Sequence, residues 1–501
     1  MSAASRVLWV NPRITTPAHA RFPLSLLSLA AHLAPRYESH ILDGNLDPAT
    51  PESVSAAVRE LAPLAVGVSV MGGPQLAPAI ALSRVLRAQH PEIPILWGGY
   101  FPSLFPASTM SADYVDYAIR GSGETVLDEL LPRLERGDTA ALHDVPGLSW
   151  RCAGEVAHNH ERPFTPAFPA GRLPYELLGD PRRYLVPSFL GRRTAAHQAA
   201  QGCRFRCTFC GVASVFRGGT ALPPPQRLES ALAALRQLGA DSLQLYDHNF
   251  FDREAETTPL LEVLARFGLP WWCYARADAL LSLSARSWQL VERSRLRMAY
   301  IGAETADATL LRQLRKGTHP EQTLEVARLC RAHGVIPELS FMLASPEDPE
   351  GGTERTFEFI RHVKRANPDA EIVVYIYTPT PAEACGGHRE SQARGLHDAH
   401  GARIDWPYSP EGWSQPQWVD YACHRDAPWL TPRLRRRIAD FVTVLRCRFP
   451  TVQDTRTAPW GRSLLRTLAG WRYRLRCYHR PHELSWSQSL LRLADPRQTS
   501  L

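Results

Sequence analysis

The chain has 501 residues, of which 44% are hydrophobic and 21% are charged. At about 100–200 residues per domain, this length predicts roughly three domains, and the composition excludes a disordered chain. Because no apolar stretch approaches ~20 residues and no apolar leader segment opens the sequence, we expect a cytoplasmic protein without a membrane span. In that compartment we expect the ten cysteines to be reduced.

The formal net charge of +7 comes mainly from arginine. Basic residues gather near the end of the chain, at 433–437 and 471–480. Such segments are compatible with nucleic acid or an acidic substrate as partner. We expect instead solvated helix faces, and no nucleic-acid binding.

The first part of the chain alternates short apolar runs with segments of helical period. The runs are 6–12, 39–44, 65–70, 93–99 and 117–123, and the helical segments lie near 23–35, 51–61, 76–89 and 124–136. Runs of this length are typical of buried parallel strands. The pattern predicts a doubly wound α/β domain, flavodoxin-like or Rossmann-like.

Small or polar residues end most of these predicted strands. In open α/β sheets, ligands bind beyond the carboxyl ends of the strands, and glycine lets a backbone approach them closely. We therefore predict that this edge holds a flat cofactor, although the same glycines are compatible with tight turns alone. The candidate residues are Asn11, Ser69, Gly72, Gly73, Gly98, Gly99, Gly121 and Glu124.

Prolines gather between 137 and 190, which predicts a linker. Strand and helix patterns then alternate again. The predicted strands are 195–200, 242–247, 271–277, 297–304, 336–343 and 370–377. Six such units predict a partial (β/α)6 barrel, in which chemistry lies on the loops after the strands.

Three cysteines, Cys203, Cys207 and Cys210, lie in the loop after the first of these strands. A structural zinc site needs four ligands, and no second pair is present. A disulfide is disfavoured by the compartment. Three cysteines are compatible with a [4Fe-4S] cluster that has one iron without a protein ligand, and Arg204 and Arg206 would favour the thiolates.

The spacing Cys-x3-Cys-x2-Cys, with Phe209 before the last cysteine and Gly211 after it, closely resembles the radical S-adenosylmethionine enzymes. The resemblance implies that the three cysteines hold the cluster and that Phe209 lies near the adenine. It also implies that the open iron binds the amino and carboxylate groups of S-adenosylmethionine. Electron transfer from the cluster then forms a 5′-deoxyadenosyl radical, with an electron donor such as flavodoxin or ferredoxin.

Other segments resemble the family more loosely. By that resemblance, Asp247 and Asn249 would contact the methionine amino group, Arg276 the carboxylate, and Glu304 the ribose hydroxyls. Each of these residues is equally compatible with a structural salt bridge at the barrel mouth.

The N-terminal part resembles the cobalamin-binding domain of one subclass of this family, through the segments 66–73, 95–106 and 115–131. It lacks the Asp-x-His-x-x-Gly signature, so no axial histidine for cobalt comes from this domain. A degenerate domain that binds nothing is the alternative. The expected divisions are 1–140 for the cobalamin-binding domain, 141–190 for the linker, 191–385 for the barrel and 386–501 for a mostly helical region.

These parts predict a class B radical S-adenosylmethionine methyltransferase, which methylates an unactivated carbon of a small-molecule substrate. Its cofactors would be the [4Fe-4S] cluster, S-adenosylmethionine and cobalamin, which supplies the methyl group. Cyclisation, rearrangement or ring contraction, and a cobalamin-binding sensor, stay open as alternatives. A tRNA methylthiotransferase fits less well, because no cysteine precedes Cys152. In the last region we expect the tryptophans at 406, 413, 418 and 429 to pack a helical cap.

Overall fold

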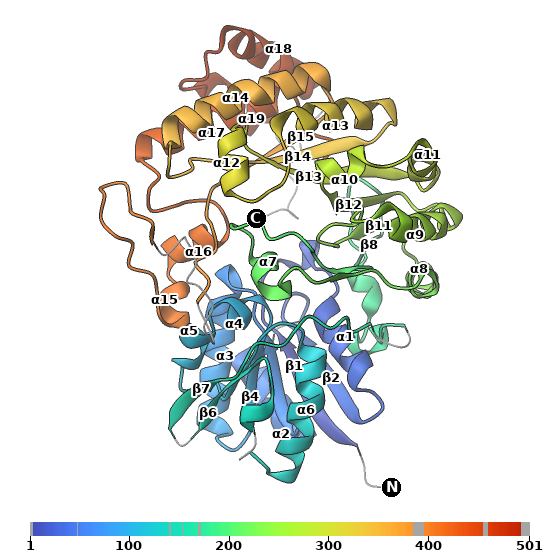
Figure 1. Ribbon diagram of the computed structural model, residues 1–501, viewed down its shortest axis with the longest axis vertical. Helices are drawn as coiled ribbons and strands as arrows, with labels where there is room; N and C mark the ends of the chain where they lie inside the picture. The colour runs from blue at the N-terminus through green and yellow to red at the C-terminus, as the bar shows by residue number, and fades with distance from the viewer. Residues whose placement is uncertain are drawn as a thin grey trace.

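The computed structural model describes residues 4–491 except 48, 140–141, 153, 169–171, 384–394 and 454–458. Figure 1 shows the N-terminal domain in blue and cyan below a second sheet in green and yellow, with the C-terminal helices in orange and red beside and above them. None of the described helices is long and apolar enough to cross a membrane.

The N-terminal domain is built on a sheet with the strand order β2-β1-β3-β4-β5-β6-β7. Its first five strands in this order are parallel. They are β1 (Ser5–Asn11), β2 (Tyr37–Asp43), β3 (Ala65–Ser69), β4 (Ile95–Gly98) and β5 (Tyr117–Ile119). This order confirms the predicted doubly wound, flavodoxin-like fold.

Helices cover both faces of this sheet. One face carries α1 (Leu24–Leu33) and α6 (Gly123–Arg136), which pack on each other, and α2 (Pro51–Leu61) packs on α3 (Leu76–Gln89) on the other. An apolar cluster that includes Leu26, Leu127 and Leu130 fills the space beneath α1 and α6. Two short helices, α4 (Tyr100–Leu104) and α5 (Pro106–Met110), follow β4 and were not predicted.

The proline-rich segment that we expected to be a linker adds two strands to the N-terminal sheet. They are β6 (Leu148–Cys152) and β7 (Glu155–His158), an antiparallel hairpin that pairs with β5. Trp150, on β6, is buried and donates a hydrogen bond to Asn159 (3.2 Å). The hairpin thereby covers the edge of β5, which would otherwise present unpaired backbone groups.

The second domain is a six-stranded parallel sheet with the order β15-β14-β13-β12-β11-β8. Since β8 and β15 do not pair, the barrel is open, as predicted. The strands are β8 (Thr194–His197), β11 (Ser242–Leu245), β12 (Trp271–Ala275), β13 (Leu296–Glu304), β14 (Ile336–Leu343) and β15 (Glu371–Ile376). A separate two-stranded pair, β9 (Gln201–Gly202) and β10 (Thr220–Ala221), brackets the cysteine loop.

The helices between these strands lie along the outer side of the sheet, as Figure 1 shows. They are α8 (Pro225–Leu238), α9 (Glu254–Phe267), α10 (Ala277–Leu281), α11 (Ala285–Arg293), α12 (Ala308–Gln313), α13 (Pro320–Ala332) and α14 (Pro349–Ala366). Their apolar faces bury one side of each strand, for example Leu243, Cys273, Ile301 and Leu339, which have no exposed surface.

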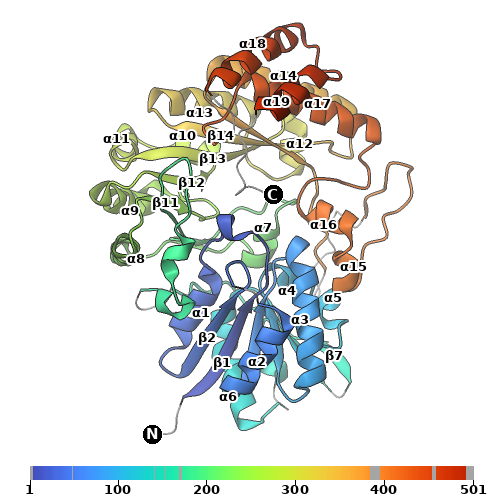
Figure 2. The ribbon, with the colours of Figure 1, turned by 180° about the vertical axis from the view of Figure 1, so that it is seen from behind.

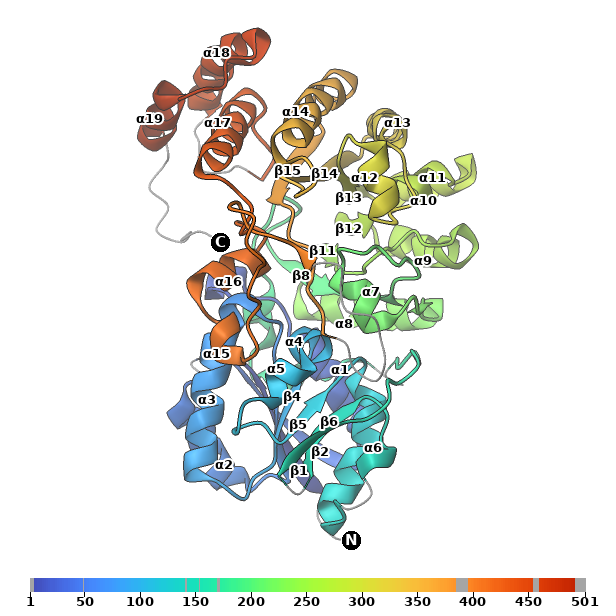
Figure 3. The same ribbon diagram turned by 60° about the vertical axis from the view of Figure 1, so that its left-hand side comes forward.

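The C-terminal region contacts both domains. Two short helices, α15 (Pro410–Trp413) and α16 (Pro416–Ala422), lie beside α3 and the turn 73–75 of the N-terminal domain (Figure 2). The longer helices, α17 (Pro432–Arg448), α18 (Pro459–Leu475) and α19 (His482–Leu491), pack together, and α17 packs on α14 (Figure 3).

The aromatic side chains of this region form the predicted core. Trp406, Trp413 and Trp418 have ring centroids 5.1–6.2 Å apart, and Phe105 of the N-terminal domain lies 4.5 Å from Trp413. Ion pairs engage part of the basic surface: Arg435 with Asp426, Arg437 with Glu354 and Arg472 with Glu483.

Candidate active site

The cysteine loop lies between β9 and α7 (Gly211–Phe216), at the junction of the two domains. The Cys210 amide donates to the Cys207 carbonyl (3.2 Å), and the Thr208 amide donates to the Leu314 carbonyl (3.0 Å), which fixes the loop to the barrel. Cys203 and Cys210 are partly exposed and Cys207 is buried.

The three thiols suit a cluster better than a single ion. Among the described residues, no three His, Cys, Asp or Glu side chains come close enough to hold one metal ion. In a [4Fe-4S] cluster each thiolate binds a different iron, so three sulfur donors on one partly exposed loop fit such a cluster. Burial raises the pKa of the Cys203 and Cys210 thiols, while Arg276 lowers that of Cys203 and Lys316 that of Cys210.

Arg276, at the end of β12, clamps this loop. Its guanidinium carbon lies 3.5 Å from the centre of the Phe205 ring, which stands between the first two cysteines. The side chain also donates to both Asp278 oxygens (2.9 Å each) and to the Lys316 carbonyl (2.6 Å). Arg276 therefore holds the loop in place. We expected Arg204 to act on the thiolates, but it pairs with Asp252 (2.8 Å).

Glu304 ends β13 with its carboxylate 2.5 Å from the Lys316 ammonium. Both side chains are buried. The backbone of Glu304 has φ 64° and follows a β-bulge after Gly302. A non-glycine residue in this region costs free energy, and such residues concentrate at functional sites. Lys316 in turn lies 6.0 Å from the centre of the Phe209 ring.

Buried polar atoms without a protein partner gather at the ends of β8 and β11. Among the described residues they include His197 Nδ1, Asp247 Oδ2, Asn249 Oδ1 and Asp252 Oδ2. An unpaired buried polar atom costs about 1–3 kcal/mol, so such a group indicates a polar ligand. Burial raises the pKa of Asp247 to about 7, although its other oxygen accepts from the Ala200 amide (2.7 Å).

The carboxyl edge of the N-terminal sheet presents backbone, with few side chains. Gly72, Gly73, Gly99 and Gly121 all have positive φ, and Gly99 is exposed. A Cβ on Gly99 would lie 2.9 Å from the Val70 carbonyl oxygen, whereas one on Gly121 would meet nothing closer than 3.9 Å. Gly98 and Ser69, the last residues of β4 and β3, are partly exposed on the same edge. An edge of this kind suits a wide flat ligand such as a corrin.

Two of the predicted cofactor residues hydrogen-bond within the protein. The Asn11 amide donates to Asp43 (2.9 Å) and accepts from Gln75 (2.9 Å). Glu124 is buried and accepts from the Ser28 hydroxyl (2.8 Å). These hydrogen bonds hold Asn11 and Glu124 within the N-terminal domain, next to the carboxyl edge of its sheet.

We call the glycine-containing carboxyl edge of the N-terminal sheet the glycine edge. It meets the cysteine loop through α4 and α7, which pack on each other. A Cβ on Gly211, directly after Cys210, would lie 3.1 Å from Leu104. Tyr100, directly after Gly99, reaches toward the loop: burial together with Cys210 and Cys203 raises its pKa. Its hydroxyl lies 3.4 Å from His248 Nε2. Tyr100 was not predicted as a site residue, and its position directly after Gly98 and Gly99 is the only sequence signal that could have indicated it.

The C-terminal region supplies a second side chain that local sequence patterns did not mark. His424 has φ 56°, and its carbonyl accepts from the Ile376 amide at the end of β15 (3.0 Å). Its Nδ1 is hydrogen-bonded to the Thr378 hydroxyl. Burial lowers the pKa of His424, while Glu304 opposes this. His424 as a residue is exposed, although its ring is desolvated.

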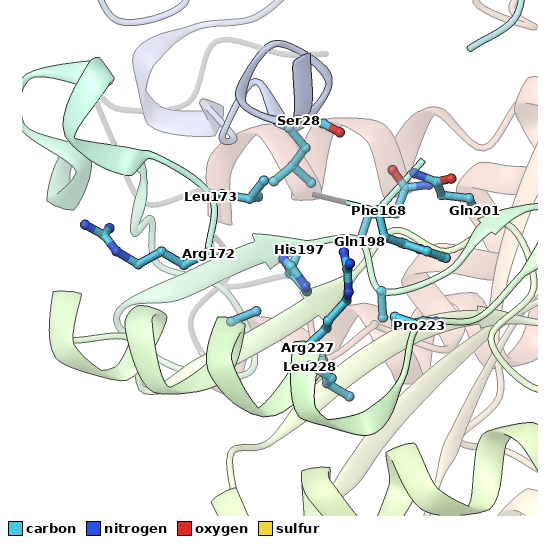
Figure 4. A pocket seen from close by; sticks show the side chains of 13 residues that line it. Ser28, Phe168, Arg172, Leu173, His197, Gln198, Gln201, Pro223, Arg227 and Leu228 are labelled. Carbon is cyan, nitrogen blue, oxygen red and sulfur yellow. The ribbon is translucent and has the colours of Figure 1, made fainter. Parts of the chain in front are cut away.

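A further pocket lies behind β8, where the domains meet, with about 670 Å³ of open space. Figure 4 shows Ser28 of α1 above it, His197 and Gln198 in its wall and Arg227 of α8 below. Residues 197–201 in this wall lead directly into the cysteine loop. The Ser28 that supports Glu124 therefore faces a space beside the cluster site.

Comparison with protein families identifies both domains. Residues 12–131 match the B12 binding domain, and residues 198–360 match the radical SAM superfamily.

An uncharacterised methyltransferase of Pyrococcus horikoshii is 22% identical over 344 residues, which is 68% of this chain and 73% of that protein. The anaerobic magnesium-protoporphyrin IX monomethyl ester cyclase of Rubrivivax gelatinosus is 22% identical over 66% of this chain and 59% of its own length.

A solved structure shares the fold. The radical S-adenosylmethionine methyltransferase TsrM from Kitasatospora setae, with cobalamin and a [4Fe-4S] cluster bound, is 16% identical. It aligns with a TM-score of 0.63 over 93% of this chain and 99% of that one. The chain is therefore a radical S-adenosylmethionine enzyme with an N-terminal B12-binding domain, and its cofactors are a [4Fe-4S] cluster, S-adenosylmethionine and cobalamin.

Proposed function

We propose that this enzyme transfers a methyl group to an unactivated carbon of a small-molecule substrate. The contact between α4 and α7 carries the proposal. It brings the glycine edge and the cysteine loop to one junction, so that a methyl carrier and a radical source would share one space. The methyltransferase of P. horikoshii and the fold of TsrM support the same reaction.

When bound, the cluster and S-adenosylmethionine would supply a radical and cobalamin a transferable methyl group. The protein would bind and orient them. Cys203, Cys207 and Cys210 would hold the cluster, and the unpaired oxygens of Asp247 and Asn249 would accept from the amino group of S-adenosylmethionine. Both oxygens are hydrogen-bond acceptors without a donor in the protein, so the N–H groups of an amino group would complement them.

Glu304 is the candidate for the ribose hydroxyls. One of its oxygens is held by Lys316, which leaves the second to accept a hydroxyl. Arg276 would hold the loop through Nε and Nη2, which donate to Asp278 and the Lys316 carbonyl, and Nη1 would be the group to bind the carboxylate of S-adenosylmethionine. The glycines at 72, 98, 99 and 121 would let the corrin approach the backbone, whereas Gly73 is buried against Ala422 and Cys423 of the C-terminal region.

Radical cyclisation is the second candidate, favoured by the similarity to the R. gelatinosus cyclase. The two reactions differ in product mass, because methylation adds one methylene unit and cyclisation adds no carbon.

The test uses anaerobically reconstituted enzyme with cobalamin, a low-potential electron donor such as flavodoxin or ferredoxin, and S-adenosylmethionine with a deuterated methyl group. We expect 5′-deoxyadenosine together with a product that carries the deuterated methyl. A product that gains no label would overturn methylation in favour of rearrangement. Cobalamin binding without any consumption of S-adenosylmethionine would instead indicate a sensor.

A further inference from the structure

The inner face of the six-stranded sheet borders open space. On the outer face, Leu243, Cys273 and Ile301 have no exposed surface because helices cover them. On the inner face, Tyr274 and Tyr300 stay partly exposed although they lie on central strands. A packed barrel core would bury both sets equally, so side chains of the described residues do not fully cover this inner face, and we call the space in front of it the chamber.

Five aromatic side chains form one continuous surface on this chamber, which we call the aromatic wall: Tyr246, Trp272, Tyr274, Tyr300 and Tyr375. Neighbouring rings are close: Trp272 and Tyr274 have centroids 4.6 Å apart, and Tyr274 and Tyr300 5.0 Å. The wall comes from four segments, since Tyr246 follows β11 and the others lie on β12, β13 and β15.

The C-terminal region closes the floor of the chamber. Gln453 donates to Glu338 (3.0 Å) and to Glu371 (3.1 Å), and the Val452 amide donates to Glu371 (2.6 Å). Trp272 of the wall also donates to Glu338 (2.9 Å). Burial raises the pKa of both carboxyls. These acids are therefore occupied by donors from the protein.

The N-terminal domain supplies a cation beside the wall. The loop after β1 rises toward the barrel (Figure 2), and Arg21 donates through Nε to the Tyr246 hydroxyl (3.4 Å). Its Nη1 donates to the carbonyls of His19 (3.2 Å) and Ala20 (3.1 Å). No ion pair joins Arg21 to a carboxylate in the described part of the chain, and its side chain is partly exposed.

Two other cations near the chamber are paired with carboxylates, while the acids Glu338 and Glu371 accept hydrogen bonds from neutral donors. Lys316 pairs with Glu304, and Arg276 pairs with Asp278. The positive charge of Arg21 is thus left for a ligand. A guanidinium of this kind binds a carboxylate or phosphate through charge-assisted hydrogen bonds.

We propose that the substrate is a flat aromatic acid, whose ring stacks on the aromatic wall and whose carboxylate or other acidic group pairs with Arg21. The proposal rests on the proposed function, because it assigns the substrate class of that reaction. Rings gain from offset or edge-to-face contacts with the wall beyond the area they bury. A purely aliphatic substrate would bury apolar area on the wall without gaining these ring–ring contacts.

The test measures binding without turnover, by equilibrium dialysis on the anaerobic holoenzyme. The probes are indole-3-acetate, its neutral amide indole-3-acetamide, and cyclohexylacetate, an acid with a saturated ring. The variants are Arg21→Gln, with Arg13→Gln as a matched control from the same loop, since Arg13 is exposed. A second pair, Tyr300→Leu and Tyr300→Phe, tests the wall.

We expect indole-3-acetate to bind more tightly than either other probe. Arg21→Gln should weaken it about tenfold or more and leave the amide and the Arg13→Gln protein unchanged. Tyr300→Leu should weaken both indole probes two- to tenfold, and Tyr300→Phe should restore them.

Equal binding of acid and amide, or equal effects at Arg13 and Arg21, would overturn the role of Arg21. Equal binding of indole-3-acetate and cyclohexylacetate would overturn the aromatic class. Because no methyl transfer is measured, failure of the proposed reaction would show separately, as normal probe binding with no labelled product.

Discussion

The two sheets of this enzyme present different chemical groups at their carboxyl edges. The N-terminal sheet ends in glycines with positive φ, of which Gly99 is exposed and Gly72 and Gly121 are partly exposed, while its polar residues Asn11 and Glu124 are hydrogen-bonded within the protein. The barrel ends in buried side chains with unpaired atoms and a strained Glu304. We propose that the first edge receives a wide cofactor through its contour, and that the second binds a small polar one through specific hydrogen bonds.

The largest test of this contrast concerns the cysteines. Replacing Cys203, Cys207 or Cys210 by alanine should abolish formation of 5′-deoxyadenosine and lower the iron content, because one iron of the cluster loses its ligand. Cys477→Ala is the control, since that cysteine is exposed and distant from the loop in sequence. Cobalamin binding should persist in all four proteins; its loss would show that the two edges are not independent.

A second test concerns the buried pair at the barrel edge. Glu304→Gln leaves the Lys316 ammonium buried without a carboxylate, which should lower the free energy of unfolding by about 3–5 kcal/mol, measured by urea titration. The double variant Glu304→Gln/Lys316→Met should recover much of that stability yet bind S-adenosylmethionine weakly. Glu256→Gln, in the exposed pair with Arg253, should leave the free energy of unfolding nearly unchanged. If the double variant bound S-adenosylmethionine as tightly as the natural protein, a role for Glu304 in binding it would be contradicted.

Asp247 should make stability depend on pH. Its folded pKa of about 7 lies above the ordinary 3.8, so between these values the unfolded state ionises while the folded state keeps the proton. Stability should therefore be fully present below about pH 4 and fall as pH rises to 7, by on the order of 2–4 kcal/mol. Asp247→Asn should remove this fall in urea titrations at pH 4.5–8. If S-adenosylmethionine placed its amino group elsewhere, adding it would leave the pH dependence of the natural protein unchanged.

The smallest effect is expected at the glycine edge. Gly99→Ala places a Cβ 2.9 Å from the Val70 carbonyl oxygen at φ 104°, so cobalamin should bind about tenfold more weakly, a loss of about 1.4 kcal/mol. Gly137→Ala, at φ 68° with nothing within 4 Å of the new Cβ, has the backbone strain without the crowding. Equal cobalamin affinity in the two variants, measured by absorbance titration, would show that close approach at Gly99 is unimportant.

Much of the fold could be predicted because glycine and proline mark the ends of short apolar runs. The strand predicted at 336–343 coincides with β14, and the helix predicted at 76–89 with α3. The β6–β7 hairpin was missed because prolines surround it and it adds to a sheet already counted as complete. The cysteine loop was recognisable from its spacing alone.

The remaining site residues depend on contacts between distant segments. Arg21 is hydrogen-bonded to Tyr246, and His424 to Thr378. The partners are far apart in the sequence, so no helix or strand periodicity could predict these contacts. Tyr100 lies in a short helix whose importance comes from packing on α7. The internal hydrogen bonds that engage Asn11 and Glu124 become visible only in three dimensions.

The closure of the chamber floor by Val452 and Gln453 has a consequence for biosynthesis. These two residues are translated after every strand of the barrel, so in a nascent chain Glu338 and Glu371 would lack these hydrogen-bond donors until residues 452 and 453 emerge from the ribosome. This part of the barrel is therefore completed by a segment that is made after all six of its strands.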